Sequence, residues 1–156
     1  MVVGLLTGNF RATLDEKSRI SLPSLLRRNL NETSVWITEG EENCLRLYPS
    51  ASWNEMLNDI MENTETLSAK DRRVRRQLIG SSQEVEIDKA GRIPIPQNYR
   101  EHAKLSRDCM VLGQVDYIEI WDEPLYKAYK TSGVDEYTAA SEELSSRMRE
   151  KKGARE

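Results

Sequence analysis

The chain has 156 residues, 38% of them hydrophobic and 31% charged, a balance that is too apolar for a generally disordered protein. Its formal net charge of −3 at pH 7 excludes a protein that is basic over its whole surface, so any contact with nucleic acid must come from local patches. No apolar run approaches the roughly 20 residues of a membrane-spanning helix, and Met1 to Leu6 is too short and uncharged for a secretory signal. We therefore expect a cytoplasmic protein with no membrane partner.

The first predicted element is a strand over residues 10–14, where apolar and polar side chains alternate as in a half-buried strand. A turn over residues 15–19 follows, because the Asp15 side chain can accept hydrogen bonds from the N–H groups ahead of it. A second strand over 20–22 ends at Pro23, which removes a ladder donor. The next predicted elements are a short amphipathic helix over 24–30, strands over 35–38 and 45–48, and a helix that starts near Ser50.

A helix over residues 68–79 is predicted next, and it carries the most basic stretch of the chain. Its cations, against the single acid Asp71, are Lys70, Arg72, Arg73, Arg75 and Arg76. A charged run on a linker helix is more often a solvated or intersubunit face than a DNA contact, and we adopt that interpretation.

After this helix the same elements return, and residue n matches residue n + 73 without a gap from about Asp15 to Trp53. The identical pairs are Asp15 with Asp88, Arg19 with Arg92, Ile20 with Ile93, Pro23 with Pro96, Arg27 with Arg100 and Gly40 with Gly113. Such a register indicates a duplication of one ββαββα unit. The second copy is predicted to have strands over 84–87, 93–95, 109–112 and 117–121, a turn over 88–92, and helices over 97–103 and from Glu123.

The repeat predicts four parts of the chain. Residues 8–56 form the first module, 57–80 the connecting basic helix, and 81–130 the second module. The polar segment 131–156 has no counterpart in the repeat, and we expect a frayed tail or a loosely held helix there.

The sequence shows no constellation of side chains that is typical of a catalytic or metal site. Cys44 and Cys109 lie far apart and are expected to be small buried apolar groups rather than a disulfide. His102 is the only histidine, too few for a His-based metal site or a catalytic triad, and we interpret it as a surface helix residue. No nucleophile–base pair, phosphate loop or metal spacing accompanies the carboxylates Glu39, Glu41, Glu42 and Asp88. We expect no enzyme, no cofactor, no metal and no small-molecule substrate.

Two copies of Asp-x-x-x-Arg, each followed by an alternating strand and a proline and joined by the Arg-rich stretch 71–76, resemble the MraZ family of the AbrB-like superfamily. The similarity covers about residues 8–130, including the aromatic-ended strands at 45–49 and 118–122. It implies a mainly β fold with short helices (α+β), in which two pseudo-symmetric modules form a swapped-hairpin, double-split β-barrel. It also implies a ring-shaped homo-oligomer and a nucleoid-associated repressor of the cell division and cell-wall operon, including its own gene, that binds spaced direct repeats in double-stranded promoter DNA.

The resemblance places DNA contact in the two Asp-x-x-x-Arg turns. Arginine can engage guanine O6 and N7 in the major groove and lysine suits phosphate, so the predicted DNA-binding residues are Arg19, Arg92, Lys17 and Lys89. Residues predicted to form the turns are Asp15, Asp88 and Gly91, the last by adopting a positive φ. The alternative is purely structural, with each arginine only pairing with its aspartate. Each base contact is worth roughly 1 to 3 kcal/mol, so several modules must act together.

The two turns are chemically unequal. The family commonly has Lys-Gly-Arg at the first turn, whereas this chain has Ser18 after Lys17, so that serine must bear the left-handed conformation. In the second turn Ala90 stands where a lysine could, which leaves Lys89 beside Arg92. We therefore expect the first turn to carry more of the DNA contact and the second more of the structure.

Two further points stay open at the level of sequence. Arg27 and Arg100 match across the repeat, and buried ion pairing, subunit contact and phosphate contact are all compatible with them.

A non-DNA role is the second functional hypothesis, because the same superfamily includes toxin antidotes that join a barrel to a toxin-wrapping tail. The segment 131–156 has only modest length and few large apolar anchors for such a role, so we rank this hypothesis below DNA binding.

Overall fold

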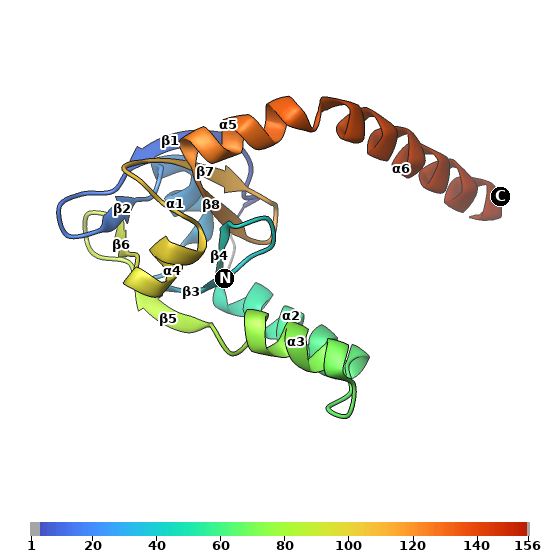
Figure 1. Ribbon diagram of the computed structural model, residues 1–156, viewed down its shortest axis with the longest axis horizontal. Helices are drawn as coiled ribbons and strands as arrows, with labels where there is room; N and C mark the ends of the chain where they lie inside the picture. The colour runs from blue at the N-terminus through green and yellow to red at the C-terminus, as the bar shows by residue number, and fades with distance from the viewer. Residues whose placement is uncertain (1–3, 156) are drawn as a thin grey trace. The chain divides into compact units, whose positions relative to one another are not determined.

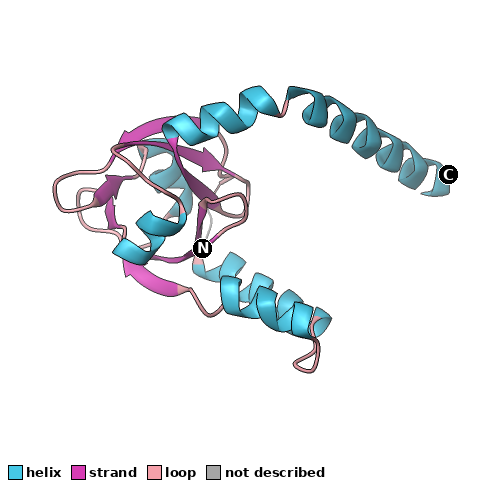
Figure 2. Cartoon of the chain, viewed as in Figure 1, coloured by secondary structure: helices cyan, strands magenta, loops and turns pink. Residues whose placement is uncertain are grey.

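The computed structural model describes residues 4–155. Met1 to Val3, which belong to the N-terminal segment that is too short for a secretory signal, and Glu156 lie outside the described residues. The chain divides into two compact units, one that ends at Glu123 and one that starts at Pro124. All the described strands, magenta in Figure 2, belong to the first unit. No helix within residues 4–155 is long and apolar enough to cross a membrane.

The elements follow one another in the predicted order (Figure 1). The strands are β1 (Asn9–Thr13), β2 (Arg19–Ser21), β3 (Ser34–Glu39), β4 (Leu45–Tyr48), β5 (Gln83–Glu86), β6 (Arg92–Pro94), β7 (Asp108–Gly113) and β8 (Ile118–Asp122). The helices are α1 (Ser24–Leu30), α2 (Ser50–Asn63), α3 (Ala69–Leu78), α4 (Gln97–His102), α5 (Glu123–Ser132) and α6 (Val134–Arg155). The predicted α+β class is therefore confirmed, but the expectation of a mainly β fold with short helices is wrong, because α2 has 14 residues and α6 has 22.

The strands form two antiparallel sheets, and the two halves of the chain exchange strands in both. The larger sheet has the order β1-β7-β8-β4-β3-β5, and the smaller one is the pair β2-β6. β1 thus pairs with β7 of the second half, while β5 pairs with β3 of the first half. Within the described residues β1 and β5 are the free edges of the larger sheet, so the ladders form two separate sheets and no closed barrel.

Alternation of apolar and polar side chains decides which face of β2 and β6 is buried, whereas all five residues of β8 are buried. Ile20 and Ile93 are directly opposite each other in the β2-β6 pair, and neither is exposed to solvent. Their neighbours in the pair, Arg19 and Arg92 among them, point to the other face because side chains alternate along a strand. The core around the two isoleucines is completed by the fully buried side chains Leu26, Leu30, Val35, Ile37, Leu45, Leu47, Tyr99, Val111, Ile118 and Ile120.

Prolines and a serine set where the helices begin. Pro23, Pro49 and Pro96 stand directly before α1, α2 and α4. α3 starts after Ser68, whose hydroxyl accepts a hydrogen bond from the Asp71 N–H at 3.3 Å, a side-chain cap of the usual kind. The expected linker helix over 68–79 is therefore confirmed.

The structure corrects the gapless register of the repeat. Trp36 pairs with Tyr48 in the first half, and Met110 pairs with Trp121 in the second, so β7 lies 74 positions after β3 while β8 lies 73 after β4. One more residue therefore separates α4 from β7 than separates α1 from β3. The β7–β8 hairpin then has one residue fewer than the β3–β4 hairpin. For this reason Gly40 and Gly113, although they match in the sequence, are not structurally equivalent. Sequence matching missed this because the two changes cancel.

Both cysteines are free and buried, as predicted. Burial raises the pKa of the Cys44 thiol, and it raises that of Cys109 to about 12, so that both stay protonated at neutral pH. The expectation for His102 is wrong: its side chain is only 15% exposed, and its Nε2 makes a 3.0 Å hydrogen bond with the Gly40 carbonyl. The last turn of α4 faces β3. The apolar periodicity of so short a helix does not show which of its faces is buried.

The second unit contains α6 and all of α5 except its first residue, Glu123, which is the last residue of the first unit. Pro124 lies in the first turn of α5, where its missing N–H needs no partner. Of the two expectations for the tail, the helix is confirmed, because α6 runs from Val134 to Arg155.

Candidate nucleic-acid interface

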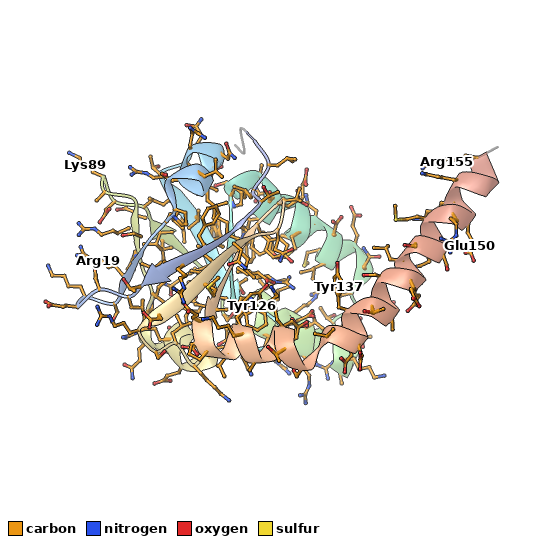
Figure 3. The ribbon with its side chains drawn as sticks, turned by 90° about the horizontal axis from the view of Figure 1, so that it is seen from above. Arg19, Lys89, Tyr126, Tyr137, Glu150 and Arg155 are labelled. Atoms are coloured by element: carbon orange, nitrogen blue, oxygen red, sulfur yellow. The ribbon has the colours of Figure 1, made fainter. Side chains whose placement is uncertain are left out.

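The two Asp-x-x-x-Arg turns lie close together because β2 and β6 pair directly after them. Each of these strands is only three residues long, so the turns flank a ribbon about 10 Å in length. The exchange continues into the turns: the Leu22 N–H donates to the Gly91 carbonyl and the Ile95 N–H to the Ser18 carbonyl, both at 2.9 Å. Figure 3 shows Arg19 and Lys89, from different halves of the chain, at the same end of the first unit.

Each aspartate forms its turn in the same way. Asp15 Oδ1 accepts hydrogen bonds from the Lys17 and Arg19 N–H groups, both at 2.9 Å, and Asp88 Oδ1 accepts from Ala90 and Arg92 at the same distances. The backbone hydrogen bond from the arginine is the main reason why the pKa of both carboxyls is lowered. Both aspartates therefore act as the ionised turn-forming residues that the sequence predicted.

The same carboxylates hold the two arginine side chains. The Nε of Arg19 donates to Asp15 Oδ2 at 2.8 Å, and that of Arg92 donates to Asp88 Oδ2 at 2.9 Å. This pairing does not consume the guanidinium, because it uses one edge and leaves the terminal amino groups for other acceptors. Arg19 Nη1 lies 4.0 Å from Asp88 Oδ2 of the other turn, and the Arg19 side chain is 26% exposed against 38% for Arg92. Orientation by aspartate and contact with a ligand are thus compatible.

Both turns contain a left-handed residue at the same place. Ser18 has φ of 57° and Gly91 has φ of 80°. The serine therefore bears the conformation that glycine adopts at no steric cost, and the two turns keep the same hydrogen-bond pattern despite their different composition.

Arg27 and Arg100 hold the turn of the opposite half. Arg100 Nη1 donates to Ser18 Oγ at 2.6 Å, and Arg27 Nη2 donates to the Lys89 carbonyl at 2.8 Å. A Cβ at Gly91 would lie 2.8 Å from Arg27 Nη1, so the Arg27 side chain occupies the space that glycine leaves open. The sequence left ion pairing, subunit contact and phosphate contact open for these two arginines, and the structure shows a further role, in which each arginine holds the turn of the other half. Each arginine reaches that turn only because the two halves of the chain exchange strands.

An open depression of about 730 Å³ lies at the first turn and reaches Arg92 of the second, and its residues carry a local excess of positive charge. Its lining includes four cations and two carboxylates: Lys17, Arg19, Arg92, Arg107, Asp15 and Glu16. Lys89, the remaining predicted contact, is exposed in the second turn outside this lining.

Sequence reasoning missed Arg107. Its carbonyl accepts a 2.9 Å hydrogen bond from the Leu14 N–H, and this contact brings its exposed side chain to the first turn. The corresponding acceptor for Ile87 is Thr33, so the second turn has no matching cation. No signal in the sequence links residue 107 to residue 14, because the contact depends on the pairing of β1 with β7.

The arginines of α3 have partly structural partners. Arg75 Nε donates to Thr64 Oγ1 at 2.8 Å and Arg72 Nη1 to the Thr66 carbonyl at 2.8 Å, which ties the α2–α3 loop to α3. Arg73 is exposed on the same helix. These contacts support the interpretation of the basic run as a structural and solvated face.

Replacing Arg100 with Met is expected to loosen the first turn but not the second. Arg100→Met removes the charged donor to Ser18 Oγ, a hydrogen bond worth about 1.5 to 3 kcal/mol, so exchange of the Lys17, Ser18 and Arg19 amides should rise by about tenfold or more. Residue-resolved hydrogen exchange measures this effect. Arg27→Met is the matched control and should loosen residues 88–92 instead; a uniform rise in both turns with either variant would contradict the crossed arrangement.

Comparison with known proteins points to one family. The family model of the MraZ protein, whose description adds a likeness to antitoxins, matches residues 5–76 and again residues 78–148. A protein of Treponema denticola named "Transcriptional regulator MraZ" is 39% identical over 139 residues, which cover 89% of this chain and 96% of that protein. Proteins with the same name are 39% identical in Treponema pallidum (strain Nichols), over 88% of this chain and 93% of that protein, and 32% identical in Yersinia pseudotuberculosis (strain YPIII), over 92% and 96%.

Proposed function

This chain belongs to the MraZ family, and on that premise we propose that it is a DNA-binding transcriptional regulator whose two Asp-x-x-x-Arg turns contact the base pairs and phosphates of double-stranded promoter DNA. One observation carries the proposal. Arg19 and Arg92, each oriented by its own aspartate, come from different halves of the chain and line one depression with an excess of cations.

The geometry suits recognition of a major groove. A bidentate arginine can discriminate guanine, and an arginine that is already oriented loses little rotamer freedom on binding. The lysines Lys17 and Lys89 are exposed at the turns, where a flexible ammonium suits phosphate. Arg107 adds a fourth cation to the depression, and we propose it as a phosphate contact as well.

The finer assignments belong to the same proposal. We propose that the modules 8–56 and 81–130, with 57–80 as connection and 131–156 as tail, form the swapped-hairpin, double-split barrel, for which the exchanged pairings β1-β7 and β3-β5 are the support. We further propose that several copies assemble into a ring, since one chain offers few base contacts and linked weak contacts gain affinity through effective concentration. We also propose that the protein represses the operon of cell division and cell-wall genes that includes its own gene, by binding spaced direct repeats in the promoter. A protein with this role would be found on the nucleoid, in the cytoplasm.

A mobility-shift assay with the full chain tests the proposal. The DNA is the promoter region upstream of its own gene, compared with the same fragment in which repeat spacing is changed by about half a helical turn, roughly 5 base pairs. Binding should be tighter to the natural spacing and should weaken steeply as salt rises, because phosphate contacts release counterions. Equal affinity for both fragments and for scrambled DNA would refute sequence-specific binding. A small protein partner that co-purifies in equal amount from the native host would favour the antidote hypothesis instead.

A further inference from the structure

The helix α6 exposes an apolar stripe. Four large apolar residues of this helix are about half or more exposed to solvent: Val134 (60%), Tyr137 (75%), Leu144 (49%) and Met148 (52%). With Ser141 between them, their spacing alternates between three and four residues, which places all five on one face of a helix. Figure 3 labels Tyr137 near the start of α6 and Glu150 and Arg155 near its end.

Charges on α6 are separated along its length. The first half, residues 134–145, contains only acids, namely Asp135, Glu136, Glu142 and Glu143. The second half carries five cations and one acid, which are Arg147, Arg149, Lys151, Lys152, Arg155 and Glu150. This order suits the helix dipole, but the dipole gives no reason for an exposed apolar stripe. The stripe also ends in a cation, because Lys151 follows Met148 at the next position of the same spacing.

We propose that α6 pairs with α6 of a second copy of this chain in antiparallel orientation. Spacing of this kind is the pattern by which two helices bury a shared seam. A parallel pair would place Lys151 against Lys151 and the two basic halves side by side, which is repulsive. The antiparallel pair places the basic half of one helix along the acidic half of the other, and Lys151 then lies near Asp135 of the second copy.

The expected layers follow from this orientation. Antiparallel pairing with the largest apolar overlap brings Tyr137 of one copy beside Met148 of the other, and Ser141 beside Leu144. The seam is only about two heptads long and contains a serine, so one pair of helices holds weakly. Several such pairs in an assembly would act together through effective concentration. The inference does not depend on DNA binding.

Cross-linking between two variants of the full chain, each with one cysteine added on α6, tests the orientation. Tyr137→Cys and Met148→Cys, distinguished by a mass tag on one of them, are mixed and treated with a short thiol-to-thiol cross-linker. The mixture should give the tagged–untagged heterodimer in clear excess, while each variant alone gives little product. The native Cys44 and Cys109 contribute little, because both are buried and have raised thiol pKa values.

The matched control uses the opposite face of the same helix. Ala139→Cys mixed with Ser146→Cys should give several times less heterodimer, since both residues are exposed but point away from the stripe. Homodimers of Tyr137→Cys and Met148→Cys in excess of the heterodimer would show a parallel pair and overturn the proposal. Equal yields from the stripe pair and the control pair would also overturn it, because they would reflect random collision.

Discussion

Arg19→Ala is expected to lower affinity for the natural promoter repeats by about 10- to 100-fold for each base contact that Arg19 makes, while affinity for scrambled DNA falls much less. The reason is that the side chain supplies a base contact oriented by Asp15, whereas the phosphate contacts that hold any sequence remain. Mobility shift at fixed salt measures both affinities, and circular dichroism should be unchanged because the arginine lies on the outer face of β2.

Two controls make the result specific. Arg92→Ala should cost less than Arg19→Ala, because the first turn supplies Lys17 to the depression and has Arg107 beside it, while the second turn supplies only Arg92. Equal losses would refute the unequal roles of the turns. Arg73→Ala removes the same charge from the exposed face of α3 and should leave the affinity nearly unchanged; a loss as large as that of Arg19→Ala would place DNA contact on the linker helix.

Ile93→Ala is expected to reduce the free energy of unfolding by about 2 to 5 kcal/mol. Ile93 is fully buried and faces Ile20 across the β2-β6 pair, so the truncation opens a cavity where the two halves of the chain interlock. Chemical denaturation followed by fluorescence of the tryptophans measures the change.

The comparison for this stability loss is Leu67→Ala. Leu67 is 92% exposed, so its truncation removes little buried surface and should change the free energy of unfolding by no more than about 0.5 kcal/mol. If Ile93→Ala were as mild as Leu67→Ala, the β2-β6 pair would contribute little to the packing of the first unit.

The two turns could be predicted from sequence because their interactions are local. Asp15 and Arg19 are four residues apart, and the hydrogen bonds between them close within one turn whatever the rest of the chain does. The conformation of Ser18 is determined by the same short ring of contacts, so that serine adopts a glycine-like φ of 57°. The burial of Ile20 likewise follows from simple alternation along β2.

The partners of Arg27 and Arg100 could not be predicted in this way. Residue 100 meets residue 18 only because β2 pairs with β6, and no local pattern encodes a contact over 82 positions. Arg107 belongs to the same class, since the pairing of β1 with β7 brings it to the first turn. The shift of β7 against β3 was hidden as well, because an extra residue and a missing one cancel in the count.

Sequence by itself determined the order of the elements, the two aspartate-held turns, the buried face of β2 and β6 and the helix α3 of the linker, since all of these arise from interactions within a few residues. Only the tertiary structure decided which half of the chain completes which sheet, which arginine holds which turn, and which cations share one depression. The physical reason is that these contacts join distant segments, and their free energy appears only after the core around Ile20 and Ile93 has brought the two halves together.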